Sequence, residues 1–290
     1  MILLELEIKN LNKNYGKKAA LNNISLTLKN GITGILAPNG AGKTTLLRIL
    51  ATISTPDSGN IYFNGKDIFE MGKSYRDIIG YLPQDFGVYP NQTAEKFLRY
   101  FAVLKGISKE KIDYKIDEIL DIVSLSHVKK KKLKTFSGGM KKRIGIAQAL
   151  LNDPKVLILD EPTASLDPDE RIKFRDFLIT ISKSRLVILS THIVSDLEAA
   201  ATDIVFMREG QVISYISPEE ALSELEDKVY EVLTSLEMVP KLKKKYIVSH
   251  SMNKKDGIAV RILGDKPEEK STMVEPNLED VYTYYYQIKC

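Results

Sequence analysis

The spacing of apolar and polar residues changes several times along this 290-residue chain. Ile24, Leu26 and Leu28 alternate with polar residues, which is the two-residue period of a half-buried strand. The apolar runs 156–160 and 186–190 are typical of strands that are buried on both faces. A helical pattern separates these two runs, so the sequence predicts a parallel sheet with crossover helices.

Turn and loop signals divide the first half of the chain. The opening segment "MILLELEI" predicts a strand that ends in a loop, and the apolar run 32–37 predicts a strand that leads into a glycine-rich loop. From Thr44 the apolar spacing becomes helical, and Asn64-Gly65 is a pair preferred by type I′ hairpin turns. Residues 94–152 show the helical period over most of their length, which predicts a mostly helical region.

The character of the chain changes after about residue 218. Short strands are predicted in "KVYEVL", "KYIVS" and "GIAVRIL", with a turn before the last of them. The final segment "PNLEDVYTYYYQ" predicts a helix that Asn277 could cap. The predicted apolar face of this helix comprises Leu278, Val281, Tyr282 and Tyr285. We therefore predict a main domain, residues 1–218, and an appended domain, residues 219–290.

Composition excludes some functions. The net charge of +4, with 28% charged residues, is that of an ordinary solvated surface and does not indicate a nucleic-acid partner. The basic run from Lys129 to Lys134 is expected to be a solvated loop, and the single cysteine, Cys290, excludes an internal disulfide. Glu5 and Glu7 interrupt the first apolar segment, which argues against a signal peptide. No apolar run is long enough to cross a bilayer, so we expect any membrane role to depend on another chain.

The segment "LAPNGAGKTTLLRIL", residues 36–50, comes close to the phosphate-binding pattern G-x-x-x-x-G-K-[ST]. Ala37 occupies the position of the first glycine. Backbone N–H groups of such a loop bind anions together with the N-terminus of the following helix. Lys43 is placed to neutralise phosphate charge, and Thr44 offers a hydroxyl to Mg²⁺. The alternative is an ordinary glycine-containing turn before a helix.

Two further segments supply groups that a nucleotide site needs. "VLILDE" is an apolar strand that ends in Asp160, which could bind Mg²⁺, and Glu161, which could act on an attacking water. "FSGGM" places Ser137, Gly138 and Gly139 at the start of a helix, where free N–H groups could meet an anion. Taken alone, an acidic turn and a capping serine would also explain these segments.

Together with "YLPQD", "ASLD" and "LSTH", these motifs occur in one order, and residues 1–218 resemble the nucleotide-binding subunit of ATP-binding cassette (ABC) transporters. The resemblance implies an α/β fold of the P-loop NTPase type, with a mixed sheet, an antiparallel β subdomain and a helical subdomain at about residues 87–152. The appended segment would form a small α+β domain. Its closing "PNLEDVY" helix is similar to ATPase subunits of bacterial drug, antibiotic and ion exporters.

The resemblance also implies roles for individual residues. Tyr15 would stack on adenine. The residues that would hold the phosphates are Pro38, Asn39, Gly40, Ala41, Gly42, Lys43, Thr44 and Thr45. Those that would bind Mg²⁺ are Thr44, Gln84 and Asp160. The catalytic group would comprise Glu161 as the catalytic carboxylate with His192, Lys43 and Gln84. Those that would act across the interface with a second subunit are Ser137, Gly138, Gly139 and Asp167.

As a whole, the resemblance implies an ATPase that uses ATP and Mg²⁺. It would pair with a second copy of itself, or a paralogous subunit, and drive a separate permease from the cytoplasmic face of the membrane. We expect an exporter; an importer ATPase would share every catalytic residue. The single set of motifs argues against a ribosome-associated ABC ATPase, and the lack of a long coiled coil between Lys43 and Asp160 argues against a DNA-repair ATPase. A binding-only module is disfavoured because Lys43, Asp160, Glu161 and His192 are all present.

Three positions depart from the family pattern. Ala37 replaces a glycine, while Phe136 and Met140 stand where leucine and glutamine are commoner. We expect all three to be tolerated. For Ala37 we predict a negative φ and a side chain packed beneath the loop, because a positive φ would strain an alanine by roughly 1 kcal/mol.

Overall fold

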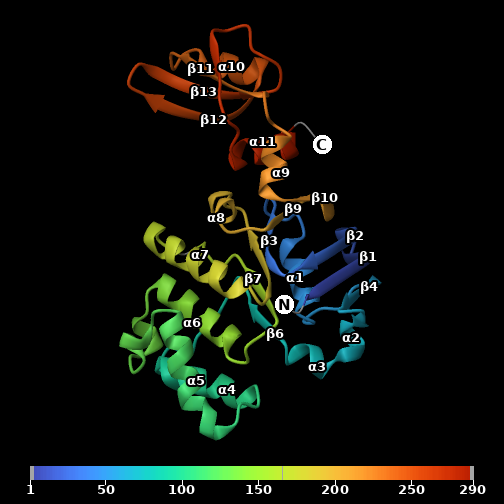
Figure 1. The fold of residues 1–290 in the computed structure, drawn as a ribbon, viewed down its shortest axis with the longest axis vertical. Helices are drawn as coiled ribbons and strands as arrows, with labels where there is room; N and C mark the ends of the chain where they lie inside the picture. The colour runs from blue at the N-terminus through green and yellow to red at the C-terminus, as the bar shows by residue number, and fades with distance from the viewer. Residues whose placement is uncertain (1–2, 165, 288–290) are drawn as a thin grey trace. The chain divides into compact units, whose positions relative to one another are not determined.

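The computed structural model describes residues 3–164 and 166–287. These fall into two compact units, Met1–Tyr215 and Ile216–Cys290, each described by itself below (Figure 1). The boundary between the units follows residue 215, close to the boundary at residue 218 that the sequence predicts. Among the described residues, no helix combines the length and the apolar character needed to cross a membrane.

A six-stranded sheet forms the centre of the first unit, with the strand order β10-β9-β3-β8-β7-β6. β3 pairs in parallel with β8 and β9, and β7 pairs in parallel with β6 and β8. The strands are β3 (Gly31–Leu36), β6 (Ile79–Leu82), β7 (Val156–Asp160), β8 (Leu186–Thr191), β9 (Asp203–Arg208) and β10 (Gln211–Ile216). Every residue of β7 and β8 is buried, which confirms the parallel sheet predicted from their apolar runs.

An antiparallel sheet of order β2-β1-β4-β5 forms a second layer of this unit. Its strands are β1 (Glu5–Tyr15), β2 (Lys18–Lys29), β4 (Ser58–Phe63) and β5 (Lys66–Asp67). The hairpin at Asn64-Gly65 is confirmed, and both residues have positive φ, 48° and 77°. The loop expected after the opening strand is wrong, because β1 continues to Tyr15. Register shifts between Ile8 and Asn14 interrupt the two-residue alternation of apolar and polar residues there. The sequence pattern therefore does not predict this part of the strand.

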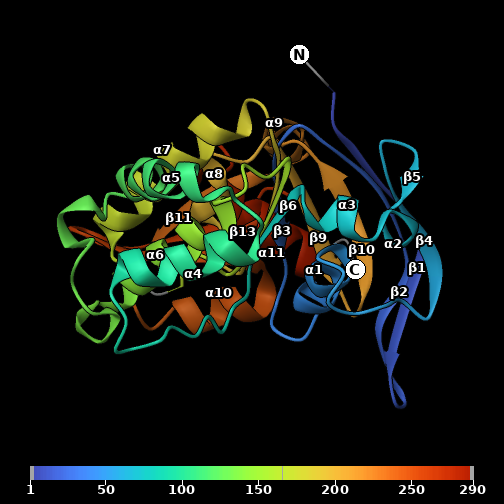
Figure 2. The ribbon, with the colours of Figure 1, turned by 90° about the horizontal axis from the view of Figure 1, so that it is seen from below.

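The helical region predicted at residues 94–152 is confirmed. It contains α4 (Ala94–Leu104), α5 (Lys109–Ile122) and α6 (Gly138–Leu150), together with short 3₁₀ turns at Ser126–Val128 and Leu133–Thr135. Within the first unit, both views place these helices on the side opposite β1, β2 and β4 (Figures 1 and 2). The remaining helices of the unit are α1 (Lys43–Leu50), α2 (Ile68–Met71), α3 (Lys73–Arg76), α7 (Pro168–Ser182) and α8 (Ser195–Glu198).

The second unit is a small α+β arrangement with a sheet of order β12-β13-β11-β14. Leu242 of α10 packs with Val232, Val260 and Ile262 on one face of this sheet. The strands are β11 (Val229–Thr234), β12 (Ile247–Lys254), β13 (Gly257–Leu263) and β14 (Ser271–Met273). The helices are α9 (Pro218–Ser223), α10 (Val239–Lys245) and α11 (Leu278–Gln287).

The closing helix α11 is confirmed, but its buried face differs in part from the predicted one. Leu278, Val281 and Tyr285 are buried, whereas Tyr282 is only half-buried. Asp280 is fully buried, because Arg261 of β13 lies 2.5 Å from its carboxylate and neutralises its charge. The side chain of Asn277 accepts a hydrogen bond from the N–H of Asp280, as expected for a cap.

Candidate functional site

The glycine-rich loop joins the end of β3 to the start of α1. Gly40 and Gly42 have φ values of 82° and 105°, the left-handed region that favours glycine. A Cβ added to Gly42 would also lie 2.5 Å from the carbonyl oxygen of Ala20. Ala37, in contrast, has a negative φ and is fully buried in the core of the unit. The prediction for Ala37 is confirmed, and the missing first glycine leaves the loop unstrained at that position.

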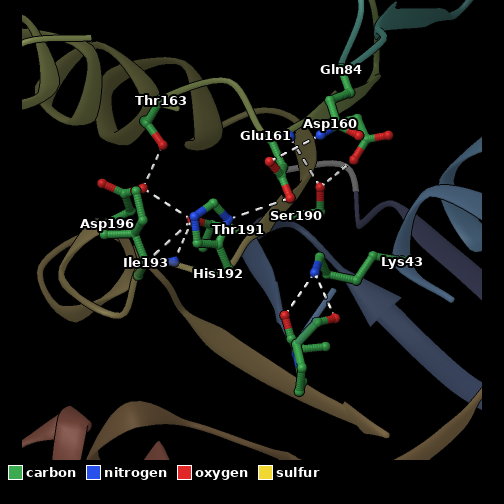
Figure 3. Close-up of polar contacts among 12 residues, drawn as sticks. Lys43, Gln84, Asp160, Glu161, Thr163, Ser190, Thr191, His192, Ile193 and Asp196 are labelled. Carbon is green, nitrogen blue, oxygen red and sulfur yellow. Dashed lines mark hydrogen bonds and ion pairs between the residues drawn. The ribbon is translucent and has the colours of Figure 1, made fainter. Parts of the chain in front are cut away.

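Lys43 begins α1 and is almost completely buried. Its Nζ donates hydrogen bonds to the carbonyl oxygens of Ala37, at 2.7 Å, and Pro38, at 3.1 Å (Figure 3). Burial lowers the pKa of Lys43, and the nearby carboxylates of Glu161 and Asp160 oppose this shift. An ammonium has three N–H donors, so the side chain can bind a phosphate oxygen while its position across the loop is maintained.

Asp160 ends β7 and lies opposite Ser190 in the neighbouring strand β8. The hydroxyl of Ser190 donates a 2.6 Å hydrogen bond to Oδ1 of Asp160. The other oxygen, Oδ2, is buried and makes no hydrogen bond among the described residues. A buried carboxylate oxygen without a partner is costly, and a hard cation such as Mg²⁺ is the partner that would satisfy it. The donor set therefore fits a magnesium ion.

Glu161 follows directly and has a positive φ of 47°, a conformation that costs free energy in a non-glycine residue. Its backbone N–H donates to the carbonyl oxygen of Ser190 at 3.2 Å and to the hydroxyl at 3.1 Å, which fixes this turn. One carboxylate oxygen accepts from Nε2 of Gln84 at 3.2 Å, and the other lies 3.4 Å from Nδ1 of His192. Groups from three different loops thus meet at one carboxylate (Figure 3).

A hollow of about 380 Å³ joins this carboxylate to the glycine-rich loop. Tyr15, which is 52% exposed, lines it from the end of β1, so the structure brings the predicted adenine-stacking ring close to the loop. The lining residues are Tyr15, Lys18, Ala20, Asn39, Gly40, Gly42, Lys43, Thr44, Thr45, Gln84 and Glu161. Lys18 and Ala20 of β2 were not predicted, because the sequence placed the segment after Tyr15 outside any strand.

Several predicted site residues do not line this hollow. Pro38, Ala41 and His192 lie in the loops beside it, and Asp160 ends β7 next to Glu161, which lines it. Ser137 and Asp167 instead begin α6 and α7, where each is exposed and caps its helix. The hydroxyl of Ser137 accepts from the N–H of Met140 at 3.1 Å, and the carboxylate of Asp167 accepts from the N–H of Glu170 at 2.8 Å. Within one chain these residues therefore cap helices and lie apart from the loop.

The two helix starts are nevertheless tied together. Arg143 of α6 and Glu170 of α7 form an ion pair with a separation of 2.6 Å. The carboxylate of Glu170 lies so close to Gly139 that an added Cβ would come within 1.8 Å of it. A side chain at Gly139 would therefore have to displace the carboxylate of Glu170, and Gly138 is exposed. Phe136, one of the two unusual neighbours, is buried, and Met140 is half-buried.

Lys142 of α6 is a functional candidate that sequence reasoning missed. Its Nζ donates a 2.9 Å hydrogen bond to the backbone carbonyl of Gln84. Burial lowers the pKa of Lys142, and Asp160 and Glu161 oppose the shift, which places a second buried ammonium near the two carboxylates. Lys142 lies in the basic segment "MKKR", where a lysine is expected to be exposed, so the sequence does not predict this contact.

Comparison with known proteins assigns the chain to a family. A family model described as "ABC transporter" matches residues 21–164. The uncharacterized ABC transporter ATP-binding protein YxlF of Bacillus subtilis (strain 168) is 41% identical over 208 residues, which cover 71% of this chain and 69% of that protein. The chain belongs to the ABC transporter ATP-binding proteins. The resemblance suggested by the motif order is thus confirmed.

Two other relatives of this ABC protein have names that state a transport role. The bacitracin transport ATP-binding protein BcrA of Bacillus licheniformis is 39% identical over 209 residues, covering 71% of this chain and 67% of BcrA. The molybdate/tungstate import ATP-binding protein WtpC of Methanocaldococcus jannaschii is 35% identical over 213 residues, covering 72% of this chain and 70% of WtpC. The relatives thus include proteins with different transport roles.

A solved structure extends the comparison to the fold. The dimeric post-hydrolysis state of the ATP-binding cassette MJ0796, bound to ADP and Pi, superposes with a TM-score of 0.67 and 27% identity. The match covers 73% of this ABC protein and 98% of that chain. The predicted P-loop NTPase-type α/β fold is confirmed, and this ABC protein is an ATP-binding subunit that hydrolyses ATP.

Proposed function

We propose that two copies of this chain close around two ATP molecules and thereby drive a separate permease. The observation that carries the proposal is the hollow in which the ring of Tyr15, Lys43 and the carboxylate of Glu161 face one space. An adenine on Tyr15 and phosphates on the loop would direct the terminal phosphate toward Glu161. The same space therefore holds groups for binding and groups for hydrolysis.

The chain supplies the groups that phosphoryl transfer to water requires. Glu161 would orient the attacking water, while Lys43 and His192 would stabilise charge on the phosphoryl oxygens. Gln84 contacts Glu161 directly and would position it. Thr44, Asp160 and Gln84 would hold Mg²⁺, which when bound neutralises charge on the β- and γ-phosphates.

A second copy would complete each site. Ser137, Gly138 and Asp167 are exposed and do not face the hollow of their own chain. The N-terminus of α6 presents backbone N–H groups, which favour a negatively charged partner such as the phosphates held by the other copy. The dimeric state of the MJ0796 cassette supports this arrangement.

We propose export as the direction of transport, at the cytoplasmic face of the membrane. The similarity to BcrA, whose name refers to bacitracin transport, supports export. Import remains the second candidate, because WtpC is named as an import protein and is 35% identical. The proteins encoded by the neighbouring genes distinguish export from import. A multi-spanning permease without a solute-binding protein would support export, and a solute-binding protein would contradict it.

Substitution of the proposed catalytic carboxylate tests the core of the proposal. Glu161→Gln keeps the size of the side chain but removes the negative charge that orients the water, so turnover should fall by about a hundredfold or more. ATP binding should persist, and size-exclusion chromatography with ATP and Mg²⁺ should show a dimer. Glu198→Gln makes the same change at an exposed position and should hydrolyse ATP normally. Normal turnover in Glu161→Gln would show that another group activates the water.

A further inference from the structure

The side chain of Asp196, in the short helix α8, lies between the loops that follow β7 and β8 and is only 6% exposed. It accepts a hydrogen bond from the hydroxyl of Thr163, two residues after Glu161. It also accepts a 3.1 Å hydrogen bond from the hydroxyl of Thr191, which immediately precedes His192. One buried carboxylate thus connects the two loops that carry Glu161 and His192 (Figure 3).

A third segment joins the same carboxylate. Nη1 of Arg171, in the first turns of α7, lies 3.8 Å from Oδ1 of Asp196. Nε of Arg171 donates a 3.2 Å hydrogen bond to the carbonyl oxygen of Leu166, the residue before Asp167. Asp196 and Arg171 therefore link the start of α7, where Asp167 is exposed for a second copy, to the loops on either side of the proposed catalytic centre.

The contacts also fix the backbone beside His192. The hydroxyl of Thr191 accepts a 2.9 Å hydrogen bond from the N–H of Ile193 while it donates to Asp196. The residues on both sides of His192 are therefore held by one hydroxyl, and that hydroxyl is held by Asp196. Asp196 does not line the nucleotide hollow, and its hydrogen bonds connect it to the segments that carry Glu161 and His192.

We propose that Asp196 is a positioning residue that holds His192 against Glu161 and joins both to the Asp167 segment. Hydrogen bonds to an ionised carboxylate are stronger than neutral ones, which suits a group that must fix two loops at once. Removal of the carboxylate leaves two hydroxyls and Arg171 without their shared acceptor, and His192 is then free to leave Glu161. The inference rests on the proposed roles of Glu161 and His192, and its test is separable from theirs.

Steady-state kinetics provides the first test. Asp196→Ala should lower kcat for ATP hydrolysis by about tenfold or more, while KM for ATP changes by less than about twofold. In a His192→Ala background the same substitution should lower kcat by a clearly smaller factor, because the loop that carries Glu161 is then the only one of the two whose reacting group Asp196 still holds. Additive losses in the double variant would overturn the inference. Glu198→Ala, at an exposed position of the same helix, is the matched control and should leave kcat unchanged.

Nuclear magnetic resonance provides a test that does not depend on turnover. The chain has only three histidines, so ¹³C-histidine labelling gives three imidazole signals, and His192→Ala identifies that of His192. Asp196→Ala should shift this signal and leave those of His127 and His250 in place. Thr191→Val keeps a β-branched side chain and removes one of the two hydroxyl contacts to Asp196, so it should shift the same signal if Asp196→Ala folds poorly.

The two proposals fail in different ways. If the His192 signal is unmoved in folded Asp196→Ala and Thr191→Val, Asp196 does not position His192, whatever the rate of Glu161→Gln. If Glu161→Gln hydrolyses ATP normally, the catalytic assignment fails even though the His192 signal responds to Asp196.

Discussion

Nδ1 of His192 lies 3.4 Å from a carboxylate oxygen of Glu161, although 31 positions separate them in the sequence. The contact follows from the sheet, because β7 and β8 are parallel neighbours and Asp160 is paired with Ser190. The residues just beyond those strand ends must then lie side by side. Parallel pairing therefore brings together two motifs that the sequence separates.

The first prediction concerns this contact. His192→Ala should lower kcat for ATP hydrolysis by about tenfold or more, because Glu161 loses a neighbour and the phosphoryl oxygens lose a donor. The affinity for ATP should change little, since His192 does not line the hollow. Phosphate-release assays at saturating ATP measure the rate, and His127→Ala is the control. A rate equal to that of the unmodified protein would remove His192 from the catalytic group.

A second prediction concerns the contact between Tyr15 and the adenine of ATP. Tyr15→Ala should raise the Kd for a non-hydrolysable ATP analogue by roughly 5- to 150-fold, since stacking of a base on an aromatic ring is worth about 1–3 kcal/mol. Tyr15→Phe keeps the ring and should bind almost normally. Isothermal titration calorimetry measures both proteins. An unchanged Kd in Tyr15→Ala would mean that the exposed ring does not contact the base.

The pattern of apolar and polar residues predicts the parts of the site that lie at the ends of strands and helices. The strand before the glycine-rich loop is mostly apolar, and the one that ends at Asp160 is a continuous apolar run up to that residue. Such local signals also located the hairpin at Asn64-Gly65, whose positive φ values suit these residue types. Each of these features is specified by neighbouring residues, so the sequence is sufficient to predict it.

Other parts depend on contacts between distant segments. Lys142 reaches the carbonyl of Gln84, and Asp196 reaches Thr163, across 58 and 33 positions of the chain. Neither residue differs in sequence from an ordinary charged residue on a helix. The β-bulges that carry β1 on to Tyr15 break the alternation that would reveal a strand. These features are specified by packing, which the linear pattern does not contain.

The third prediction concerns the missing first glycine of the loop. Ala37→Gly should leave turnover within about twofold, because the φ of Ala37 is already negative and the methyl group is buried beneath the loop. Stability should fall by about 0.5–1 kcal/mol, since glycine loses more backbone freedom on folding. Urea denaturation and phosphate release measure the two effects.

Gly42→Ala provides the contrast and should impair the loop, because the φ of Gly42 is 105° and the added Cβ would meet a carbonyl oxygen. A large gain in turnover for Ala37→Gly would show that the alanine impairs the loop after all.

The last prediction uses Lys105, which follows α4 and donates a hydrogen bond to Oδ1 of Asn152. Burial lowers the pKa of Lys105 from 10.5 to about 8. Between these two values the unfolded chain carries a proton on this side chain that the folded protein lacks, so the free energy of unfolding gains a contribution that rises with pH. The penalty of burying the ammonium is thus fully present below about pH 8 and is relieved toward pH 10.5.

Denaturation at several pH values isolates this contribution. The free energy of unfolding of the unmodified protein, minus that of Lys105→Met, should rise by roughly 1–3 kcal/mol between about pH 7 and pH 10, while effects of other groups cancel in the difference. Lys109→Met makes the same change at an exposed lysine, the first residue of α5, and is the matched control. A flat difference for Lys105→Met, or one that falls with pH, would show that Lys105 remains charged in the folded protein, because only loss of its proton on folding makes the difference rise.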